Sequence, residues 1–262
     1  MLAAVCVGDA KKLAELMRQD PGFKVNLVLD GVGCILLHYA CGDDRRSAVI
    51  PLLLAHPDID VNVKTRDGST PFCVACLHGN TSCVREMLKD SRVNVNEPDI
   101  GGSTTLWCAA FCGHIEVIKW WIASGREMDL GTPGDIGKTD AIGMSKKYGK
   151  AKVVTLLERF KSDTAQTRHA MRVKLGWYDE VAAEMFALVV FVSDGLLQVN
   201  DTATPTPAAR FFSIVTRLPL ELQMVLCFRQ VGSPKEIIQG EESEGAFVSL
   251  AESLLWSSFF TK

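Results

Sequence analysis

Four cysteines in the first half of the chain are the residues whose types and spacing could support chemistry. Cys73 and Cys76 form a Cys-x-x-Cys pair, and Cys108 and Cys112 follow in the next part of the chain. Clustered thiolates are typical ligands of Zn²⁺. A buried cysteine also behaves as a small hydrophobic residue. A metal- or redox-responsive protein therefore stays an alternative, but we expect a structural role and no metal.

No other pattern in the sequence is typical of a catalytic centre. It contains no Gly-x-x-x-x-Gly-Lys-Ser/Thr loop, no Gly-x-Ser-x-Gly nucleophile, no His-Glu-x-x-His and no paired carboxylates. The pair Trp120-Trp121 could capture a cation, but its position suits bulk in a core or on a helix face. We expect a protein that is not an enzyme and needs no cofactor.

Composition and charge indicate which classes of protein and which kinds of partner are expected. The chain has 262 residues, 47% hydrophobic and 23% charged, with a net charge of −3. We therefore expect neither nucleic-acid binding nor disorder. The apolar run from Met185 to Val192 is far shorter than the roughly 20 residues of a membrane span. The odd number of cysteines and an N-terminus without a basic segment predict reduced thiols and a cytoplasmic or nuclear location.

The elements that must position these residues recur with a fixed period. Glycines recur at intervals of 35, 34 and 35 residues, at Gly33, Gly68, Gly102 and Gly137. A Val-Asn pair keeps nearly the same period, at Val25-Asn26, Val61-Asn62 and Val95-Asn96. Two independent markers with one period predict a repeat architecture.

Each repeat has the signals of two helices. In the third repeat, Thr70 is a suitable N-cap, Pro71 suits the first helical position and Gly79 can end the helix in the left-handed conformation. Gly113 and Gly149 end the equivalent helices. Apolar residues at spacings of three and four then predict a second helix in each unit, for example at Val84, Met87 and Leu88, or Val153, Val154 and Leu157.

These patterns resemble ankyrin repeats, whose Gly-x-Thr-Pro-Leu-His-x-Ala string matches Gly68–Ala75. The resemblance implies an all-α solenoid of helix pairs with loop or hairpin fingers, followed by a helical C-terminal region. Five units are expected, at about 1–30, 31–65, 66–99, 100–134 and 135–160. The second unit has one residue too many between its helices, so we expect an irregular turn at Cys41–Arg46.

The resemblance implies a protein–protein interaction module, an adaptor or scaffold, with its partner on the concave surface. Position by position, it places His38 as a turn-bracing residue and Cys76 in the core. Because Leu77, Ile100 and Phe111 form an apolar centre in the implied contact strip, we expect Phe111 to be the hydrophobic anchor. The contact positions that it implies are Val32, Cys34, Asp43, Arg66, Asp67, Ser69, Leu77, His78, Ile100, Ser103, Phe111, Cys112, Asp135, Ile136, Lys138, Lys146 and Lys147.

The period ends near Phe160. We expect residues 161–199 to be helical and to pack on the last repeat, 200–209 to form a Thr/Pro-rich loop, and 210–262 to be helical. Within the last region, Leu218–Leu226 is similar to the opening of F-box domains. That similarity implies an alternative function, a substrate receptor of a ubiquitin ligase, in which a Skp1-like adaptor would contact Leu218, Pro219, Leu222 and Leu226.

Overall fold

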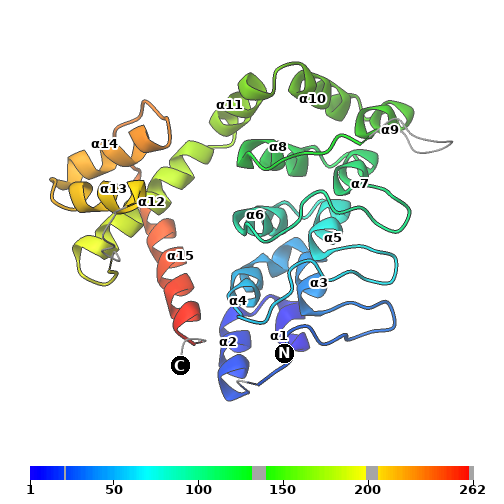
Figure 1. The fold of residues 1–262 in the computed structure, drawn as a ribbon, viewed down its shortest axis with the longest axis horizontal. Coiled ribbons are helices and arrows are strands. Elements are labelled where there is room, and N and C mark those ends of the chain that lie inside the picture. Colours follow the sequence, from blue (N-terminus) through cyan, green and yellow to red (C-terminus); the bar gives the residue numbers. More distant parts are fainter. Residues whose placement is uncertain (21, 132–139, 199–205, 260–262) are drawn as a thin grey trace. The chain divides into compact units, whose positions relative to one another are not determined.

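A computed structural model describes residues 1–20, 22–131, 140–198 and 206–259, and these residues contain helices and no strand (Figure 1). The chain divides into two compact units. One unit comprises Met1–Met171 together with Trp256–Lys262, and the other comprises Arg172–Leu255. We call residues 1–171 the repeat stack and Arg172–Leu255 the C-terminal unit. The all-α fold class predicted from the sequence is therefore confirmed.

The repeat stack consists of successive helix pairs. In chain order its elements are α1 (Leu2–Val7), α2 (Ala10–Gln19), α3 (Leu36–Cys41), the 3-10 helix η1 (Asp44–Val49), α4 (Ile50–Leu54), α5 (Pro71–His78), α6 (Thr81–Lys89), α7 (Thr105–Cys112), α8 (Ile115–Ser124), α9 (Ala141–Lys147) and α10 (Ala151–Ser162). The first helices pack in the series α3, α5, α7 and α9, and the second helices α4, α6, α8 and α10 pack beside one another. Each pair thus contacts its neighbours, as a solenoid requires.

The helix ends follow the local signals in the sequence. Thr70 and Thr104 accept hydrogen bonds from the backbone N–H groups of Cys73 and Trp107, each at 3.2 Å. Gly79 ends α5 with a φ of 73°, which a residue with a Cβ adopts only under strain. The predicted caps and stops are therefore present.

An asparagine ladder joins the repeats. The Asn62 side-chain amide donates to the backbone carbonyl of Arg92 (2.9 Å), and its carbonyl oxygen accepts from the N–H of Asn94 (2.8 Å). Asn26 and Asn96 make the same pair of bonds to the unit that follows each of them. The recurring Val-Asn marker is thus explained: the valine is buried, and the asparagine satisfies backbone groups of the next unit.

The core of the stack uses small residues where the first helices meet and large ones beneath. Cys41, Cys76 and Ala110 are completely buried in α3, α5 and α7. Trp121 in α8 is also fully buried and meets the ring of Phe72 edge to face, with centroids 5.2 Å apart. Dispersion and apolar burial at such contacts hold one repeat against the next.

The second unit departs from the helix-pair geometry, as its extra residue suggests. A 3-10 helix, η1, stands before the short helix α4. Asp44 at its start accepts hydrogen bonds from the N–H and hydroxyl of Ser82, at 2.7 and 2.9 Å. Because Asn80 makes no side-chain cap bond, Asp44 caps α6 of the next repeat instead. The irregular segment therefore has a stacking role.

Residues 161–199 divide between the two units, whereas the sequence suggested one segment on the last repeat. In α11 (Thr164–Lys174), Arg168 donates to the carbonyl of Ile122 in the stack at 3.3 Å. The next helix, α12 (Trp177–Ser193), packs on α14 of the C-terminal unit. Because α12 is apolar on nearly all sides, it needs cover on several sides, and α13, α14 and α15 of the C-terminal unit provide it.

The C-terminal unit has one core. It contains α12, α13 (Pro207–Val215), α14 (Leu220–Gln230) and the part of α15 (Gly240–Phe259) up to Leu255. Its buried residues include Phe186, Val189, Val215, Cys227 and Phe228. The expected loop 200–209 is shorter at its end, because α13 begins at Pro207; residues 200–205 lie outside the described residues. No described helix has the length and hydropathy needed to cross a bilayer.

Candidate functional site

The fingers between the repeats form a connected backbone edge. Each finger is closed by a backbone hydrogen bond, such as Thr65 N–H to Ser69 C=O at 3.0 Å. Adjacent fingers are also joined, because Arg66 N–H donates to Val32 C=O (2.8 Å) and Ile100 N–H donates to Asp67 C=O (3.2 Å). The side chains at the tips are therefore held in a defined register on one face of the stack.

Two aspartates of the fingers, Asp30 and Asp67, accept hydrogen bonds from groups of their own turns or of the helix that follows. Asp30 accepts from three backbone N–H groups, those of Val32, Gly33 and Cys34, and from the Tyr39 hydroxyl. These bonds hold its pKa well below the usual range. The carboxylate of Asp67 accepts from the hydroxyls of Thr65 and Ser69, which also lowers its pKa. Asp67, an expected contact residue, thus shapes its finger.

The structure places most of the expected contact residues on the face made by the fingers and first helices. The exposed ones are Val32, Arg66, Asp67, Leu77, His78, Ile100, Lys146 and Lys147. The half-buried ones are Cys34, Asp43, Ser69, Ser103, Phe111 and Cys112. Asp135, Ile136 and Lys138 lie outside the described residues.

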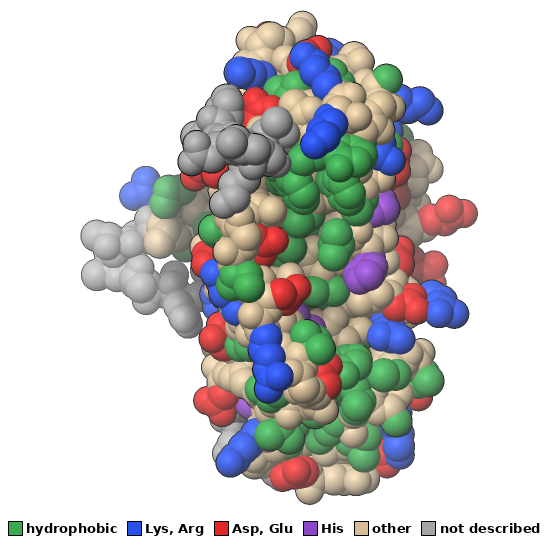
Figure 2. Space-filling view, turned by 90° about the vertical axis from the view of Figure 1, so that its right-hand side faces the viewer, with side chains coloured by type: hydrophobic (Ala, Val, Ile, Leu, Met, Phe, Trp, Pro, Cys, Tyr) green, Lys and Arg blue, Asp and Glu red, His purple; other side chains and the backbone are tan. Residues whose placement is uncertain are grey.

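Three aromatic side chains gather at the upper end of this face. Trp107 and Phe111, one turn apart on α7, are stacked with centroids 5.4 Å apart and planes within 5°. The ring of Tyr148 meets Phe111 edge to face at 4.7 Å. Figure 2 shows hydrophobic side chains on the upper half of this face with lysine and arginine side chains nearby. We call Trp107, Phe111 and Tyr148 the aromatic platform.

The predicted set of contact residues does not include Tyr148, because the fifth unit has a different register from the one used for the prediction. Counting from Gly137 aligned Lys146 with Phe111. In the structure, Asp140 is the N-cap of α9 and Gly149 takes the left-handed conformation that ends it, one position later than that count. Counting from Gly113 to Gly149, the two glycines that follow the first helices of the fourth and fifth units, gives the correct register from the sequence alone.

Lysines adjoin the platform. The Lys147 amine lies 5.7 Å from the centroid of the Tyr148 ring, within range of a cation–π interaction. The side chain of Lys150 crosses Gly113, where an added Cβ would lie 2.8 Å from Lys150 Cδ. Lys146 is instead paired with Glu158 at 2.7 Å. The platform therefore has an apolar centre and a basic edge.

His38 braces its turn as the resemblance implied. Its Nδ1 accepts a hydrogen bond from Ile35 N–H, and its Nε2 donates to Ser69 C=O in the next finger, both at 3.2 Å. Burial lowers the pKa of the imidazole. The neutral ring therefore satisfies one backbone group in each of two repeats.

Six of the nine cysteines are buried, and Cys6, Cys34 and Cys112 are half-buried. All nine cysteines are free, and the part of the chain that the structure describes has no cluster of three potential metal ligands. Burial raises the pKa of Cys41 and Cys76 well above the ordinary value. A hydrogen bond between Cys73 and Cys108 raises the pKa of Cys108. The same hydrogen bond lowers the pKa of Cys73. Because Zn²⁺ binds the thiolate, burial makes Cys41 and Cys76 poor ligands.

The F-box-like string lies at the start of α14. Pro219 and Leu222 are exposed, whereas Leu218 is half-buried and Leu226 packs against the core of the C-terminal unit. Gln223 is buried, and its amide donates to Leu218 C=O at 3.0 Å. The structure therefore turns only two of the four expected adaptor-contacting side chains outward.

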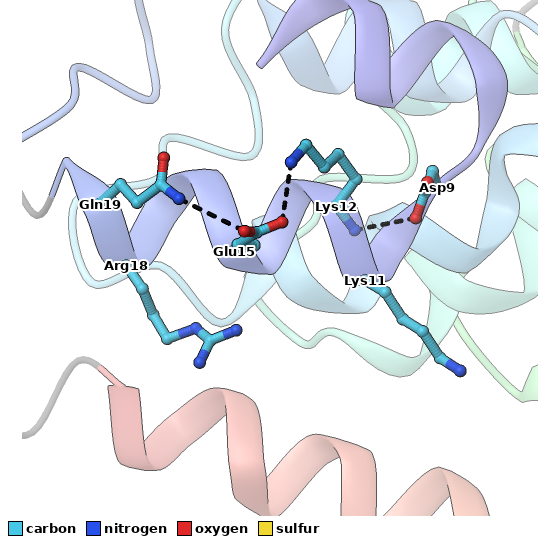
Figure 3. Close-up of a pocket in the computed structure, with 6 residues that line it drawn as sticks. All are labelled: Asp9, Lys11, Lys12, Glu15, Arg18 and Gln19. Carbon is cyan, nitrogen blue, oxygen red and sulfur yellow. Dashed lines mark hydrogen bonds and ion pairs between the residues drawn. The ribbon is translucent and has the colours of Figure 1, made fainter.

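A shallow pocket along α2 is lined by polar and charged residues (Figure 3). Lys12 Nζ lies 2.8 Å from Glu15, and Gln19 donates to the same carboxylate at 3.4 Å. Asp9 accepts from the backbone N–H of Lys12 as the helix cap. Lys11 and Arg18 complete its lining. These are surface helix interactions rather than a catalytic arrangement.

Curated relatives resemble this chain over part of its length. "SMC5-SMC6 complex localization factor protein 1" of Bos taurus is 31% identical over 58% of the chain, and its Homo sapiens counterpart matches equally. The matched stretch covers 14% of each of these proteins. The Oryza sativa subsp. japonica protein "Probable E3 ubiquitin-protein ligase XBOS31" is 32% identical over 45% of the chain and 26% of its own length.

The family model of ankyrin repeats matches residues 37–132 in three copies. The match lies within the helix pairs, fingers and asparagine ladder described above. Ankyrin repeats are protein-interaction modules. This chain therefore contains a stack of ankyrin repeats, three of which span residues 37–132.

Proposed function

We propose that this chain is a non-catalytic adaptor or scaffold that binds another protein across the fingers and first helices of its ankyrin repeats. The fingers present side chains from several repeats in a fixed register, because backbone bonds join one finger to the next. The first helices add their outward side chains to the same face. A partner can therefore be contacted by several repeats at once.

The observation that carries this proposal is the aromatic platform. Large aromatic residues with a polar rim are typical of the energetically dominant part of an interface. Trp107, Phe111 and Tyr148 already restrain one another, so little side-chain freedom remains to be lost on binding. Nearly half of the Tyr148 side chain is exposed, which leaves surface for a partner to cover.

A role in bringing proteins together also agrees with the name of the Bos taurus and Homo sapiens relatives, localization factor of the SMC5-SMC6 complex. By analogy we extend the proposal to a cytoplasmic or nuclear location, with the nucleus favoured. Microscopy of the fluorescently tagged full-length chain tests this part, and a signal confined to membranes contradicts it.

Affinity capture tests the proposed interface. Full-length wild-type chain and Phe111→Ala chain are used as baits in a cell extract, and captured proteins are quantified by mass spectrometry. We expect at least one partner to fall about tenfold with Phe111→Ala, because a central aromatic anchor is lost. The matched control is Leu196→Ala, an exposed residue of the C-terminal unit. Unchanged recovery of every partner by folded Phe111→Ala chain contradicts the assignment.

A second candidate function is a substrate receptor of a ubiquitin ligase. The exposure of Leu220 and Leu222 at 53% and 49% favours it, because both leucines lie outward on the α14 helix that carries the F-box-like string. A relative is also named as a ubiquitin-protein ligase. In this proposal a Skp1-like adaptor contacts α14, while the ankyrin repeats select the substrate.

Binding to a purified Skp1-like adaptor protein tests this alternative. We expect Leu222→Asp to abolish binding, since a charge would replace an apolar contact. Ile237→Asp is the matched control, because Ile237 is exposed in the same unit outside the string. Absence of binding by the wild-type chain, or equal binding by both variants, overturns this function.

A further inference from the structure

The aromatic platform and its lysines define the chemistry of a partner more closely than the repeat fold does. Trp107 and Phe111 are parallel and Tyr148 stands edge-on to Phe111, so the platform offers ring surface rather than an enclosed aromatic cage. Such a surface suits one apolar or aromatic side chain lying against it. It provides the anchor point of a short segment.

The charge beside this anchor point is positive. Among the residues that the structure describes, neither Lys147 nor Lys150 has a carboxylate within ion-pair distance, whereas Lys146 is neutralised by Glu158. Lys147 is held over the Tyr148 ring, and Lys150 crosses Gly113 directly after Cys112. The two amines therefore remain available next to the rings.

The start of α10 adds to this positive charge. Lys150 is the N-cap residue of this helix and makes no side-chain cap hydrogen bond. The first-turn N–H groups of a helix carry partial positive charge and favour an anion. Because Lys150 follows Tyr148 by two positions, this helix end lies beside the platform.

We propose that the platform binds a short partner segment in which an apolar or aromatic residue is followed by acidic residues. This inference rests on the proposed function and specifies its partner. The anchor residue covers Phe111 and Tyr148, while the carboxylates reach Lys147 and Lys150. A protein segment fits better than nucleic acid, because the chain as a whole is acidic and has no excess of cations to neutralise a phosphate backbone.

Selection from a displayed library of random 12-residue peptides tests the proposal. The full-length chain is the bait, and peptides that also bind the Phe111→Ala chain are removed. We expect the retained peptides to carry Asp or Glu within three positions of an aromatic or aliphatic residue, several times more often than the starting library. Retained peptides without an acidic excess, or no retained peptides, overturn the inference.

Charge variants then test the basic edge with the best retained peptide. We expect the double variant Lys147→Gln/Lys150→Gln to lower its affinity about tenfold, and Lys147→Arg/Lys150→Arg to preserve it. Lys11→Gln, an exposed lysine on α2, serves as the control and leaves the affinity unchanged. Equal affinity for the double glutamine variant overturns the inference, as does tighter lysine-dependent binding of a 20-base-pair DNA duplex.

The two proposals fail in different ways. If cell-extract partners depend on Phe111 but no acidic peptide is selected, the interface stands and the partner class is wrong. If neither depends on Phe111, the proposed function fails as well.

Discussion

The repeat stack and the C-terminal unit are both helical, but they are stabilised in different ways. In the stack, three kinds of contact recur between neighbouring repeats: the asparagine ladder, the finger-to-finger bonds and the buried small residues of the first helices. The C-terminal unit instead has one core, to which α12, α13, α14 and α15 each contribute. Periodic contacts leave a periodic sequence, whereas a single core leaves none.

This contrast predicts two independent unfolding responses. We expect Trp121→Ala to cause the largest loss, about 4 kcal/mol, because a fully buried ring that packs on Phe72 is removed. Urea unfolding of the full chain, followed by circular dichroism, measures it. The loss should appear in the transition of the stack. An equal loss in the C-terminal unit would show that the two units unfold together.

Phe228→Ala is the counterpart in the C-terminal unit. Its ring is completely buried in the single core of that unit, so we expect a loss of about 3 kcal/mol there. Hydrogen exchange measured by mass spectrometry should show faster exchange in α12 and α14, with α5 to α8 unchanged. Faster exchange in the stack as well would show that the two units are not stabilised independently.

Asn62→Ala tests the ladder with a smaller expected effect. The variant removes the solvent-exposed side-chain bonds to Arg92 C=O and Asn94 N–H, so we expect a loss of about 1 kcal/mol. The free energy of unfolding in urea measures it. A control substitution, Lys11→Ala, changes an exposed side chain elsewhere in the repeat stack and should leave the free energy of unfolding within about 0.5 kcal/mol of the wild-type value. Equal free energies of unfolding for the two variants would show that the asparagine ladder does not stabilise the stack.

The smallest effect expected is a pH dependence confined to the stack. Burial lowers the pKa of His38 below its ordinary value of 6.5, so the unfolded state binds the proton more readily. Stability from the neutral ring is therefore complete above about pH 6.5 and is lost as the pH falls through the folded-state pKa. An NMR titration of the imidazole gives this pKa directly. A value at or above 6.5 contradicts the prediction.

Much of the stack could be predicted because its determinants are local. Thr70 and Thr104 cap helices, and Gly79 and Gly113 end them, in positions that depend only on neighbouring residues. The same local signals did not give the capping of α6 by Asp44, since that bond joins residues of two repeats. Nor did they assign α12 to the C-terminal unit, because its apolar sequence is compatible with cover from either side.

The candidate site shows the same division. Phe111 was expected from its repeat position, and the structure places it in the aromatic platform. The place of Tyr148 beside Phe111 depends on the register of the fifth unit, in which α9 ends at Lys147 and Gly149 takes the left-handed conformation. All of the predicted partner contacts stay predictions, and Asp135, Ile136 and Lys138 lie outside the described residues.

The sequence by itself determined the repeat period, the helix pairs and the resemblance to ankyrin repeats, because capping residues, glycines and apolar spacing act over a few residues. Only the tertiary structure decided which side chains meet across repeats and which helices share a core. Those outcomes depend on contacts between residues far apart in the chain, such as Phe111 with Tyr148 and α12 with α14. Their geometry is set by packing, which no short stretch of sequence contains.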